Sequence, residues 1–194
     1  MLIFVRHGRT AANAAGLLQG RTDHPLDELG EQQAVAVAAF VRDAAGGRID
    51  QVISSPLGRA RQTAEAFEQP FEVDERWIEL SYGVYEGVPH ADVPSEVWNM
   101  WRIDPWYVPE GGEALAALDA RVRLACDEVA PSAIERNVVV VSHVSPMKAA
   151  VAWALDVDLA ISWRSHLSHA SVCRIDMRRH GPVLVSFNET VPVR

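Results

Sequence analysis

Three apolar runs along the chain end abruptly in polar turns. The runs occupy 2–5, 52–53 and 138–141, and their residues are mainly β-branched or aromatic. Short runs of this kind, bounded by turn residues, are typical of buried strands. Between them, apolar residues recur at spacings of three and four, as they do from Leu115 to Val129, which is the pattern of one helix face. The alternation predicts a mostly parallel sheet with helices on both of its faces.

Capping and turn residues set the limits of the predicted elements. Asp27 is suited to begin a helix that runs to about 45, where Gly46 and Gly47 would end it. The last two predicted strands are separated by only a few residues, so we expect an antiparallel hairpin and therefore a mixed sheet. The predicted fold is α/β, a three-layer sandwich. Its other elements are strands near 51–55, 71–73, 138–142, 171–177 and 182–188, and helices near 59–67 and 146–154.

The segment from about 88 to 110 interrupts this alternation. It contains Trp98, Trp101 and Trp106, and its only Lys or Arg residue is Arg102. Aromatic side chains contribute strongly to apolar cores, so most of these rings are expected to pack against the rest of the protein. A segment that covers a site also carries specificity, and we expect one or two of the rings to face a ligand.

Composition narrows the class of protein. A chain of 194 residues suits one domain. The net charge of −8 and the absence of a Lys/Arg-rich block argue against nucleic acid and anionic membranes as partners. Cys126 and Cys173 each fall within an apolar pattern and are expected to be buried free thiols in a reducing compartment. Neither a secretory leader nor a membrane-spanning run is recognisable, so we expect a cytoplasmic protein.

Cationic and imidazole side chains follow the apolar runs. Arg6 and His7 come directly after the first run, Arg59 follows the second and His143 follows the third. Open α/β sheets bind ligands outside the carboxyl ends of their strands. Guanidinium groups match phosphate oxygens, and a neutral imidazole can act as a nucleophile or a base. These side chains predict a phosphate-binding site at one edge of the sheet.

Five sequence elements together resemble a known family, the histidine phosphatase superfamily, which is also called phosphoglycerate mutase-like. The resemblance extends from residue 1 to about 155, and it implies one histidine phosphatase domain over 1–194 with a lid-like insertion at about 88–110. In chain order the elements are Arg6-His7-Gly8-x-Thr10, Ser55-x-Leu57-x-Arg59-Ala60-x-Gln62-Thr63-Ala64, Glu79 ahead of Tyr85-Glu86-Gly87, Gly111-Gly112-Glu113, and Ser142-His143.

The resemblance and the needs of phosphoryl transfer imply a role for each strand-end residue. His7 would be the nucleophile, kept neutral by the neighbouring guanidinium groups of Arg6 and Arg59, which would bind phosphate. By resemblance, the other ring nitrogen of His7 would donate to the carbonyl of Gly8. His143 is expected to be a protonated donor to the phosphoryl oxygens rather than a second nucleophile.

A departing alkoxide needs a proton, so a carboxyl group is expected in the pocket. The family pattern places this proton donor at Glu79, and Glu86 is then a structural residue at a tight turn. Glu113 either lines the pocket or interacts with a helix N-terminus. Further phosphate-binding residues are expected in the first loop, namely Thr10, Asn13, Gln19 and Gly20.

The function implied is a metal-independent phosphomonoesterase that hydrolyses a small organic phosphate through a phosphohistidine. No cofactor is expected, because His166 and His169 lack the accompanying ligands of a metal site. One alternative is a bisphosphoglycerate-dependent phosphoglycerate mutase, which the single arginine of the lid, Arg102, disfavours. The other alternative is a catalytically silent protein that binds a partner through the pocket. An aromatic lid could also serve a homodimer interface.

Two positions depart from the family pattern. Val144 follows the second histidine where glycine is common, so the backbone there must differ if the usual glycine takes a positive φ. Arg9 stands where Glu or Gln is frequent, and it is expected to add positive charge at the mouth of the pocket.

Overall fold

The computed structural model describes residues 1–193 and is built around one six-stranded sheet. The strand order is β3-β2-β4-β1-β5-β6. The first four strands in this order are parallel, and β5 and β6 are each antiparallel to their neighbours. The predicted mixed sheet is confirmed. Its strands are β1 (Leu2–Arg6), β2 (Gln51–Ser54), β3 (Glu72–Val73), β4 (Val138–Ser142), β5 (Val172–Arg178) and β6 (Gly181–Glu189).

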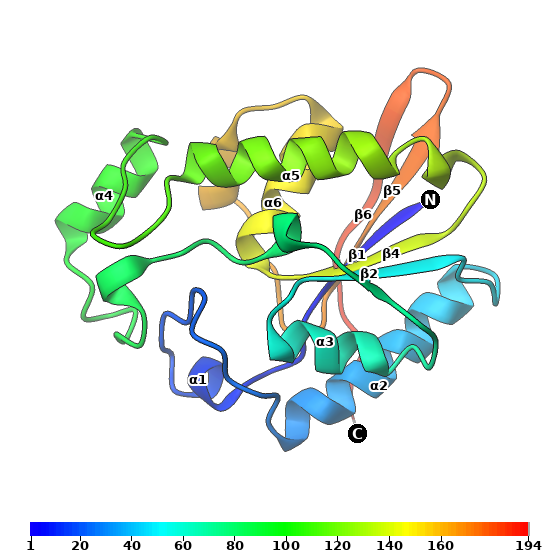
Figure 1. Ribbon diagram of the computed structural model, residues 1–194, viewed down its shortest axis with the longest axis horizontal. Coiled ribbons are helices and arrows are strands. Elements are labelled where there is room, and N and C mark those ends of the chain that lie inside the picture. The colour runs from blue at the N-terminus through cyan, green and yellow to red at the C-terminus, as the bar shows by residue number, and fades with distance from the viewer. Residues whose placement is uncertain (194) are drawn as a thin grey trace.

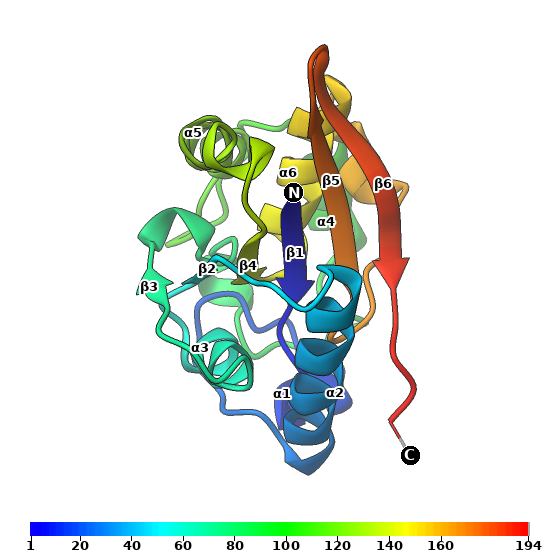
Figure 2. The same ribbon diagram turned by 90° about the vertical axis from the view of Figure 1, so that its right-hand side faces the viewer.

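Helices cover both faces of the sheet, as Figures 1 and 2 show. The pair α2 and α3 packs on one face, and the pair α5 and α6 packs on the other. The predicted three-layer α/β sandwich is confirmed. The α-helices are α1 (Ala11–Ala14), α2 (Glu28–Ala44), α3 (Gly58–Glu65), α4 (Ser95–Ile103), α5 (Leu115–Val129) and α6 (Val144–Leu155), and short 3-10 helices are η1 (Glu75–Trp77), η2 (Gly83–Tyr85), η3 (Ser132–Ile134) and η4 (Leu159–Trp163).

The first apolar run is buried on both sides because successive strand residues point to opposite faces. Leu2 and Phe4 belong to the core under α5 and α6. Ile3 and Val5 belong to the core over α2 and α3. With both faces covered, the parallel strands leave their ends as the places where a ligand can reach the sheet.

The predicted helix boundaries hold where a capping residue defines them. Asp27 caps α2, and its side chain accepts a hydrogen bond from the Gly30 N–H at 2.8 Å. Gly46 and Gly47 follow this helix with φ of +68° and +83°, values that suit glycine. The helix predicted near 146–154 begins earlier, at Val144, because His143 is its extended N-cap residue.

The segment 88–110 forms α4 and two flanking loops at the end of the molecule toward which β1 runs (Figure 1). Trp101 is 2% exposed and belongs to a small apolar cluster with Leu18, against which Trp98 packs. Tyr107 also packs against this cluster, so most of the rings pack as expected, and Trp106 is the exception at 72% exposed. The segment therefore has an apolar core of its own beside the sheet.

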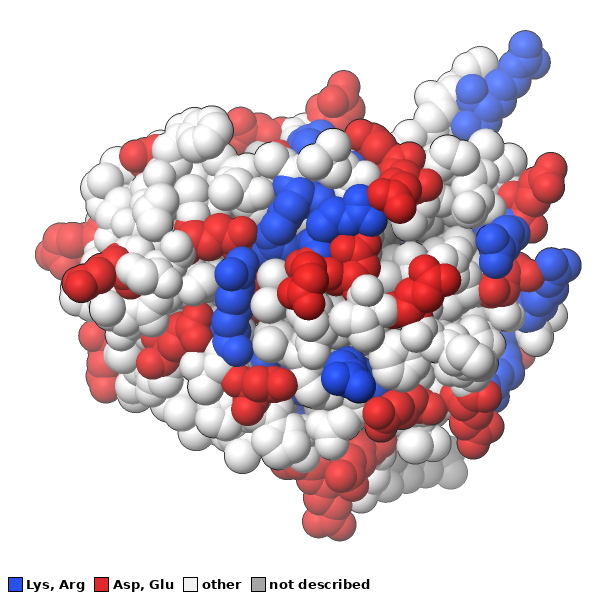
Figure 3. Space-filling view, viewed as in Figure 1, with Lys and Arg blue, Asp and Glu red and all other residues white. Residues whose placement is uncertain are grey.

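Acidic side chains are scattered over the face shown in Figure 3; some Lys and Arg side chains gather near its middle, and others lie toward its right edge. This distribution agrees with the net charge of −8. Cys126 and Cys173 are both buried and free, as predicted. Within residues 1–193, no helix has the length and apolar character needed to cross a membrane.

Candidate active site

A cavity of about 290 Å3 opens at the carboxyl ends of the parallel strands. Arg6 and His7 reach it from the end of β1, and Arg59 reaches it from the first turn of α3. The structure thus brings together side chains that are more than 50 positions apart in the sequence. The other predicted site residues in its wall are Asn13, Gln19, Gly20 and Glu79.

His7 is held in one orientation by its own loop. Its Nδ1 lies 2.7 Å from the carbonyl oxygen of Gly8, and because a carbonyl only accepts, Nδ1 carries the proton. The predicted bond to Gly8 is confirmed, and Nε2 is left with a free lone pair. Burial lowers the pKa of His7 well below its usual value, and the charges of Arg59 and Arg6 lower it further. The imidazole is therefore neutral at physiological pH.

The two arginines are fixed by backbone carbonyls. Arg6 donates from Nη1 to Leu167 O at 2.7 Å. Arg59 donates to Thr22 O at 2.9 Å and to Gly20 O at 2.7 Å. Burial lowers the pKa of Arg6 to about 10, so its guanidinium keeps its charge near neutral pH.

Several buried polar atoms around the cavity lack a hydrogen-bond partner among residues 1–193. They include the Nε atoms of both Arg6 and Arg59, Nδ1 of His143 and Oε1 of Gln19. An arginine Nε–H can only donate, and buried donors are costly when left unpaired. An oxyanion in the cavity would supply acceptors for these donors.

His143 lies next to His7 and is not among the described wall residues of the cavity. Its ring centre is 5.0 Å from that of His7, and its Nε2 is 2.7 Å from Ser55 Oγ. Burial lowers its pKa well below the usual value, and the charges of Arg59, His7 and Arg6 act in the same direction. This ring is therefore neutral in the ligand-free protein, and its role as a protonated donor to bound phosphoryl oxygens stays a prediction.

Glu79 is anchored from several sides. Oε1 accepts from the backbone N–H groups of Leu80 at 2.7 Å and Ser145 at 3.3 Å. Its carbonyl accepts from Arg21 Nε at 3.1 Å and Arg121 Nη2 at 3.4 Å. Oε2 accepts no hydrogen bond from the described part of the chain. The carboxylate thus has one oxygen fixed by the backbone and one available to a ligand.

Glu113 stabilises this arrangement from outside the cavity. Its carboxylate accepts from Arg21 Nη2 at 3.0 Å and from Arg121 Nε and Nη2 at 3.0 Å each. These are the same two arginines that hold the carbonyl of Glu79. Glu113 is not among the described wall residues of the cavity; it orients a pair of guanidinium groups and directly precedes Ala114, the N-cap of α5.

Glu86 has the predicted structural role. Its two oxygens accept from the backbone N–H groups of Arg21, Thr22 and Tyr82 at 2.8 to 3.2 Å. Gly20 has a φ of +53°, and a Cβ there would overlap the Glu86 carboxylate. Glycine suits this close approach. Through Glu86, the loop whose carbonyls bind Arg59 is connected to the segment after Glu79.

Thr10 and Arg9 are placed away from the cavity. Thr10 is the N-cap of α1, and its Oγ1 accepts from the Asn13 N–H while the Asn13 side chain accepts from Thr10 N–H in return. Its predicted phosphate contact has no support in this geometry. Arg9 pairs with Asp27 at 2.8 Å and does not extend into the cavity wall. The expectation that Arg9 adds charge at the pocket mouth is wrong, because a nearby carboxylate holds it.

Val144 occupies its position without strain. It is the first residue of α6, and it is absent from the described non-glycine residues with positive φ. The backbone after His143 is therefore helical, and the valine side chain contributes to the cavity wall.

Some polar residues of the cavity wall were not predicted from the sequence. They include Tyr82, His90 and Lys148. Trp98 is the ring of the segment 88–110 that lines this cavity, and its contact with a ligand stays a prediction. Lys148 is the only lysine of the chain, among 17 arginines, and this contrast is a signal that the sequence does contain. Arg102 instead stacks over the ring of Trp163, with 5.8 Å between Cζ and the ring centre.

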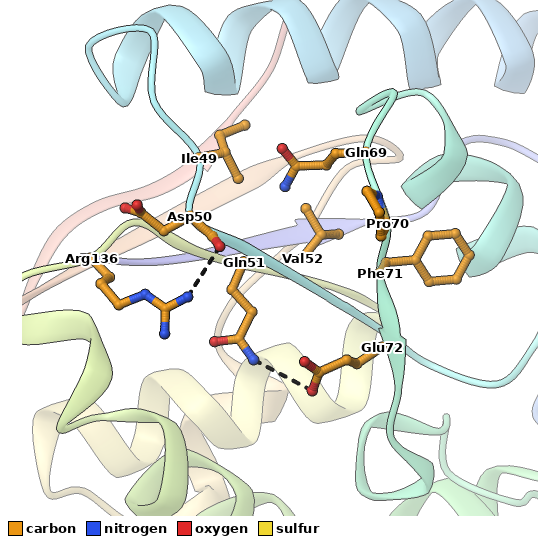
Figure 4. Close-up of a pocket in the computed structure, with 9 residues that line it drawn as sticks. All are labelled: Ile49, Asp50, Gln51, Val52, Gln69, Pro70, Phe71, Glu72 and Arg136. Carbon is orange, nitrogen blue, oxygen red and sulfur yellow. Dashed lines mark hydrogen bonds between the residues drawn. The ribbon is translucent and has the colours of Figure 1, made fainter.

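A second depression lies at the amino end of β2 and differs in chemistry. Figure 4 shows Arg136 hydrogen-bonded to the backbone oxygen of Asp50, and Gln51 hydrogen-bonded to Glu72. Its polar groups therefore pair with one another, whereas those at the other end of the sheet are left for a ligand. Within residues 1–193, no cluster of three His, Cys, Asp or Glu side chains is suited to hold a metal ion, and His166 and His169 form none.

The sequence of this chain is similar to those of known proteins. The chain is 34% identical over 178 residues to a bifunctional protein of Mycobacterium tuberculosis, covering 88% of this chain and 48% of that protein. This chain thus spans about half the length of that relative. It is also 34% identical to phosphoserine phosphatase 1 of Hydrogenobacter thermophilus, covering 97% of this chain and 92% of that one.

Solved structures give the same result. A phosphoserine phosphatase of Entamoeba histolytica, in complex with 3-phosphoglyceric acid, superposes with a TM-score of 0.87 at 28% identity, covering 97% of this chain and 96% of the other. The family model described as histidine phosphatase superfamily (branch 1) matches residues 2–190. The chain therefore belongs to branch 1 of the histidine phosphatase superfamily.

Proposed function

We propose that this chain is a phosphomonoesterase that transfers the phosphoryl group of a small organic phosphate to His7 and then to water. The state of His7 carries the proposal. Its Nδ1 is occupied by the Gly8 carbonyl at 2.7 Å, so the free lone pair is on Nε2. Burial, together with the charges of Arg59 and Arg6, lowers the pKa of His7 and keeps the ring neutral. The forks of the two arginines match the oxygens of a phosphate.

In this mechanism Nε2 of His7 attacks phosphorus, and the bond from phosphorus to the leaving oxygen breaks. Glu79 gives that oxygen a proton, which the wall position of its carboxyl group supports. Water then attacks the phosphohistidine, Glu79 takes its proton, and inorganic phosphate leaves. Arg6, Arg59 and His143 stabilise the charge on the phosphoryl oxygens. A bound phosphate would raise the pKa of His143 and favour its charged form.

The chain would work as one domain, with the segment 88–110 as a lid over the site. Trp98 of this segment lines the cavity, which supports contact between the lid and the leaving group. Relatives named as phosphoserine phosphatases support a small phosphomonoester as the ligand.

Hydrolysis of para-nitrophenyl phosphate between about pH 5 and 8, with EDTA present, tests the proposal. The native protein is expected to turn over, and His7→Ala is expected to lose turnover by several orders of magnitude, because the nucleophile is gone. His180→Ala is the matched control, since His180 is exposed on the turn between β5 and β6. Quenching in alkali and measuring intact mass should detect one added phosphoryl group on the native protein.

Equal turnover in His7→Ala and in the native protein would overturn the assignment of the nucleophile. If neither hydrolyses any monoester, but 2,3-bisphosphoglycerate triggers phosphate exchange between positions of phosphoglycerate, the mutase alternative replaces the phosphatase. Partner capture that is unaffected by His7→Ala, in a protein without turnover, would instead indicate the silent binding protein.

A further inference from the structure

The wall of the larger cavity contains an ammonium group without an ion pair, that of Lys148. Lys148 lies in the second turn of α6, is half-buried, and donates from Nζ to the carbonyl of Ser162 at 2.7 Å. An ammonium carries three N–H donors, and no carboxylate of residues 1–193 lies within 4.0 Å of it. The remaining donors are available to a ligand.

The surroundings of Lys148 are apolar and enclosed. A smaller cavity of about 90 Å3 adjoins the first, and both share Tyr82, Trp98, Val144 and Lys148 as wall residues. The rest of the smaller cavity includes Trp101 and Trp163. A charge in such surroundings is costly unless it is paired, so an anion on the ligand would be stabilised here.

Electrostatics in the cavity favour a particular charge on the leaving group. Glu79 is the only carboxylate among the described wall residues of the larger cavity, and it is assigned to proton transfer. Arg6, Arg59 and Lys148 are all cationic. An ammonium group on the substrate would therefore meet repulsion and would have no acid to pair with.

We propose that Lys148 binds a carboxylate on the leaving group, and that the preferred substrates are phosphate esters of short hydroxycarboxylic acids that carry no ammonium group. The proposal rests on the phosphatase function given above. The carbon skeleton of such a substrate would lie against Val144, Tyr82 and Trp98, and its phosphate would lie between Arg6 and Arg59.

Three probes of nearly equal size separate the contributions. In 3-phosphoglycerate a carboxylate stands where glycerol 1-phosphate has a hydroxymethyl group. O-Phosphoserine keeps this carboxylate and has an ammonium group in place of the C2 hydroxyl. We expect kcat/KM to be about tenfold or more higher for 3-phosphoglycerate than for glycerol 1-phosphate, the size expected for one hydrogen bond between charged groups. We also expect 3-phosphoglycerate to exceed O-phosphoserine. A glycerol 1-phosphate rate equal to that of 3-phosphoglycerate would overturn the proposal.

Variants of Lys148 assign the preference to this residue. In Lys148→Met, the ratio of kcat/KM between 3-phosphoglycerate and glycerol 1-phosphate should fall to near one, because the ammonium is lost. In Lys148→Arg, which keeps the charge, most of the ratio should remain. Turnover of para-nitrophenyl phosphate by each variant reports whether the phosphate end still functions. A ratio unchanged in Lys148→Met would contradict the assignment.

A binding measurement tests the proposal separately from catalysis. Because Lys148 is the only lysine, protein grown with 13C-labelled lysine has one Cε signal, whose titration gives the pKa of this group directly. In the His7→Ala protein, 3-phosphoglycerate should raise that pKa more than glycerol 1-phosphate does. Equal shifts would overturn the proposal even if the phosphatase function holds. If the pKa shift is greater with 3-phosphoglycerate but the native protein hydrolyses no phosphomonoester, the carboxylate site is retained and the phosphatase function is rejected.

Discussion

In the proposed mechanism, the imidazole of His7 owes its reactivity to its neighbours rather than to its own strength as a base. A hydrogen bond to the Gly8 carbonyl at 2.7 Å fixes the tautomer, and burial with Arg59 and Arg6 keeps the ring unprotonated. A low pKa weakens a nitrogen as a nucleophile. The gain is that the lone pair on Nε2 is free near neutral pH.

Glu79→Gln separates proton transfer from phosphate binding. The amide oxygen can still accept from Leu80 and Ser145, but it supplies no proton. We expect kcat for an alkyl phosphate to fall by roughly 100-fold or more. With para-nitrophenyl phosphate the loss should be much smaller, because its leaving group departs as a stable anion. Steady-state kinetics with both substrates measure this, and Glu110→Gln, at an exposed position, is the control. Equal losses on the two substrates would contradict the assigned role.

At the scale of elements, the loop after β1, which contains His7, Gly8 and Arg9, lies directly on the first turn of α2. A Cβ at Gly30 would overlap the carbonyl oxygen of Arg9, and a Cβ at Gly8 would overlap that of Gly30. Two glycines thus allow two backbones to touch. This contact sets how far the end of β1 lies from the helix.

Gly30→Ala should consequently act against helix propensity. Alanine within an exposed helix favours folding by about 1 kcal/mol over glycine. Here the methyl group would displace the loop that contains His7. We expect a loss of about 1–3 kcal/mol in the free energy of unfolding and a reduced kcat. Urea unfolding measures the loss of stability. Glu31→Ala, at the exposed next position, is the control for this measurement. A more stable Gly30→Ala protein would show that the loop yields.

The hydrogen bonds from Arg21 and Arg121 to the Glu79 carbonyl connect the first loop and α5 to the segment that contains Glu79. In Glu113→Gln the two guanidinium groups lose a charged partner. We expect the free energy of unfolding to fall by about 1–3 kcal/mol, and kcat for alkyl phosphates to fall more than kcat for para-nitrophenyl phosphate. Glu128→Gln removes an exposed ion pair with Arg76 and should cost less than about 1 kcal/mol. A uniform loss on both substrates would indicate that Glu113 does not act through Glu79.

The same scale explains what the sequence could predict. The strand ends at His7 and His143 follow from apolar runs whose carboxyl ends must meet at one edge. Thr10 was misplaced because a capping box with Asn13 competes locally for its hydroxyl. Lys148 was missed because the side of α6 that faces the cavity is decided by packing between distant elements, and the even burial of that helix hides it.

At the scale of the whole molecule, the buried histidines couple folding to pH. The pKa values of His7 and His143 are lowered in the folded protein, so below about pH 6.5 the unfolded chain binds protons that the folded protein does not. Stability should therefore fall with falling pH, by about 1.4 kcal/mol per pH unit for each histidine. Urea unfolding at pH 7, 6 and 5 measures the slope.

A variant and a ligand make that slope diagnostic. His7→Asn should reduce the slope by one proton equivalent. Vanadate, an oxyanion that would favour the protonated form of His143, should flatten it further. If the native protein and His7→Asn have the same slope, the histidine does not titrate as its burial implies.

The neighbours of β1 in the sheet bear on how the protein is made. β1 pairs with β4 and β5, and Arg6 donates to Leu167 O and, through its backbone, to Ser171 O. The segment that carries His7 can therefore pair only after partners more than 130 positions further along have been synthesised. These long-range contacts slow folding, and the cavity around His7 forms only once those partners are present.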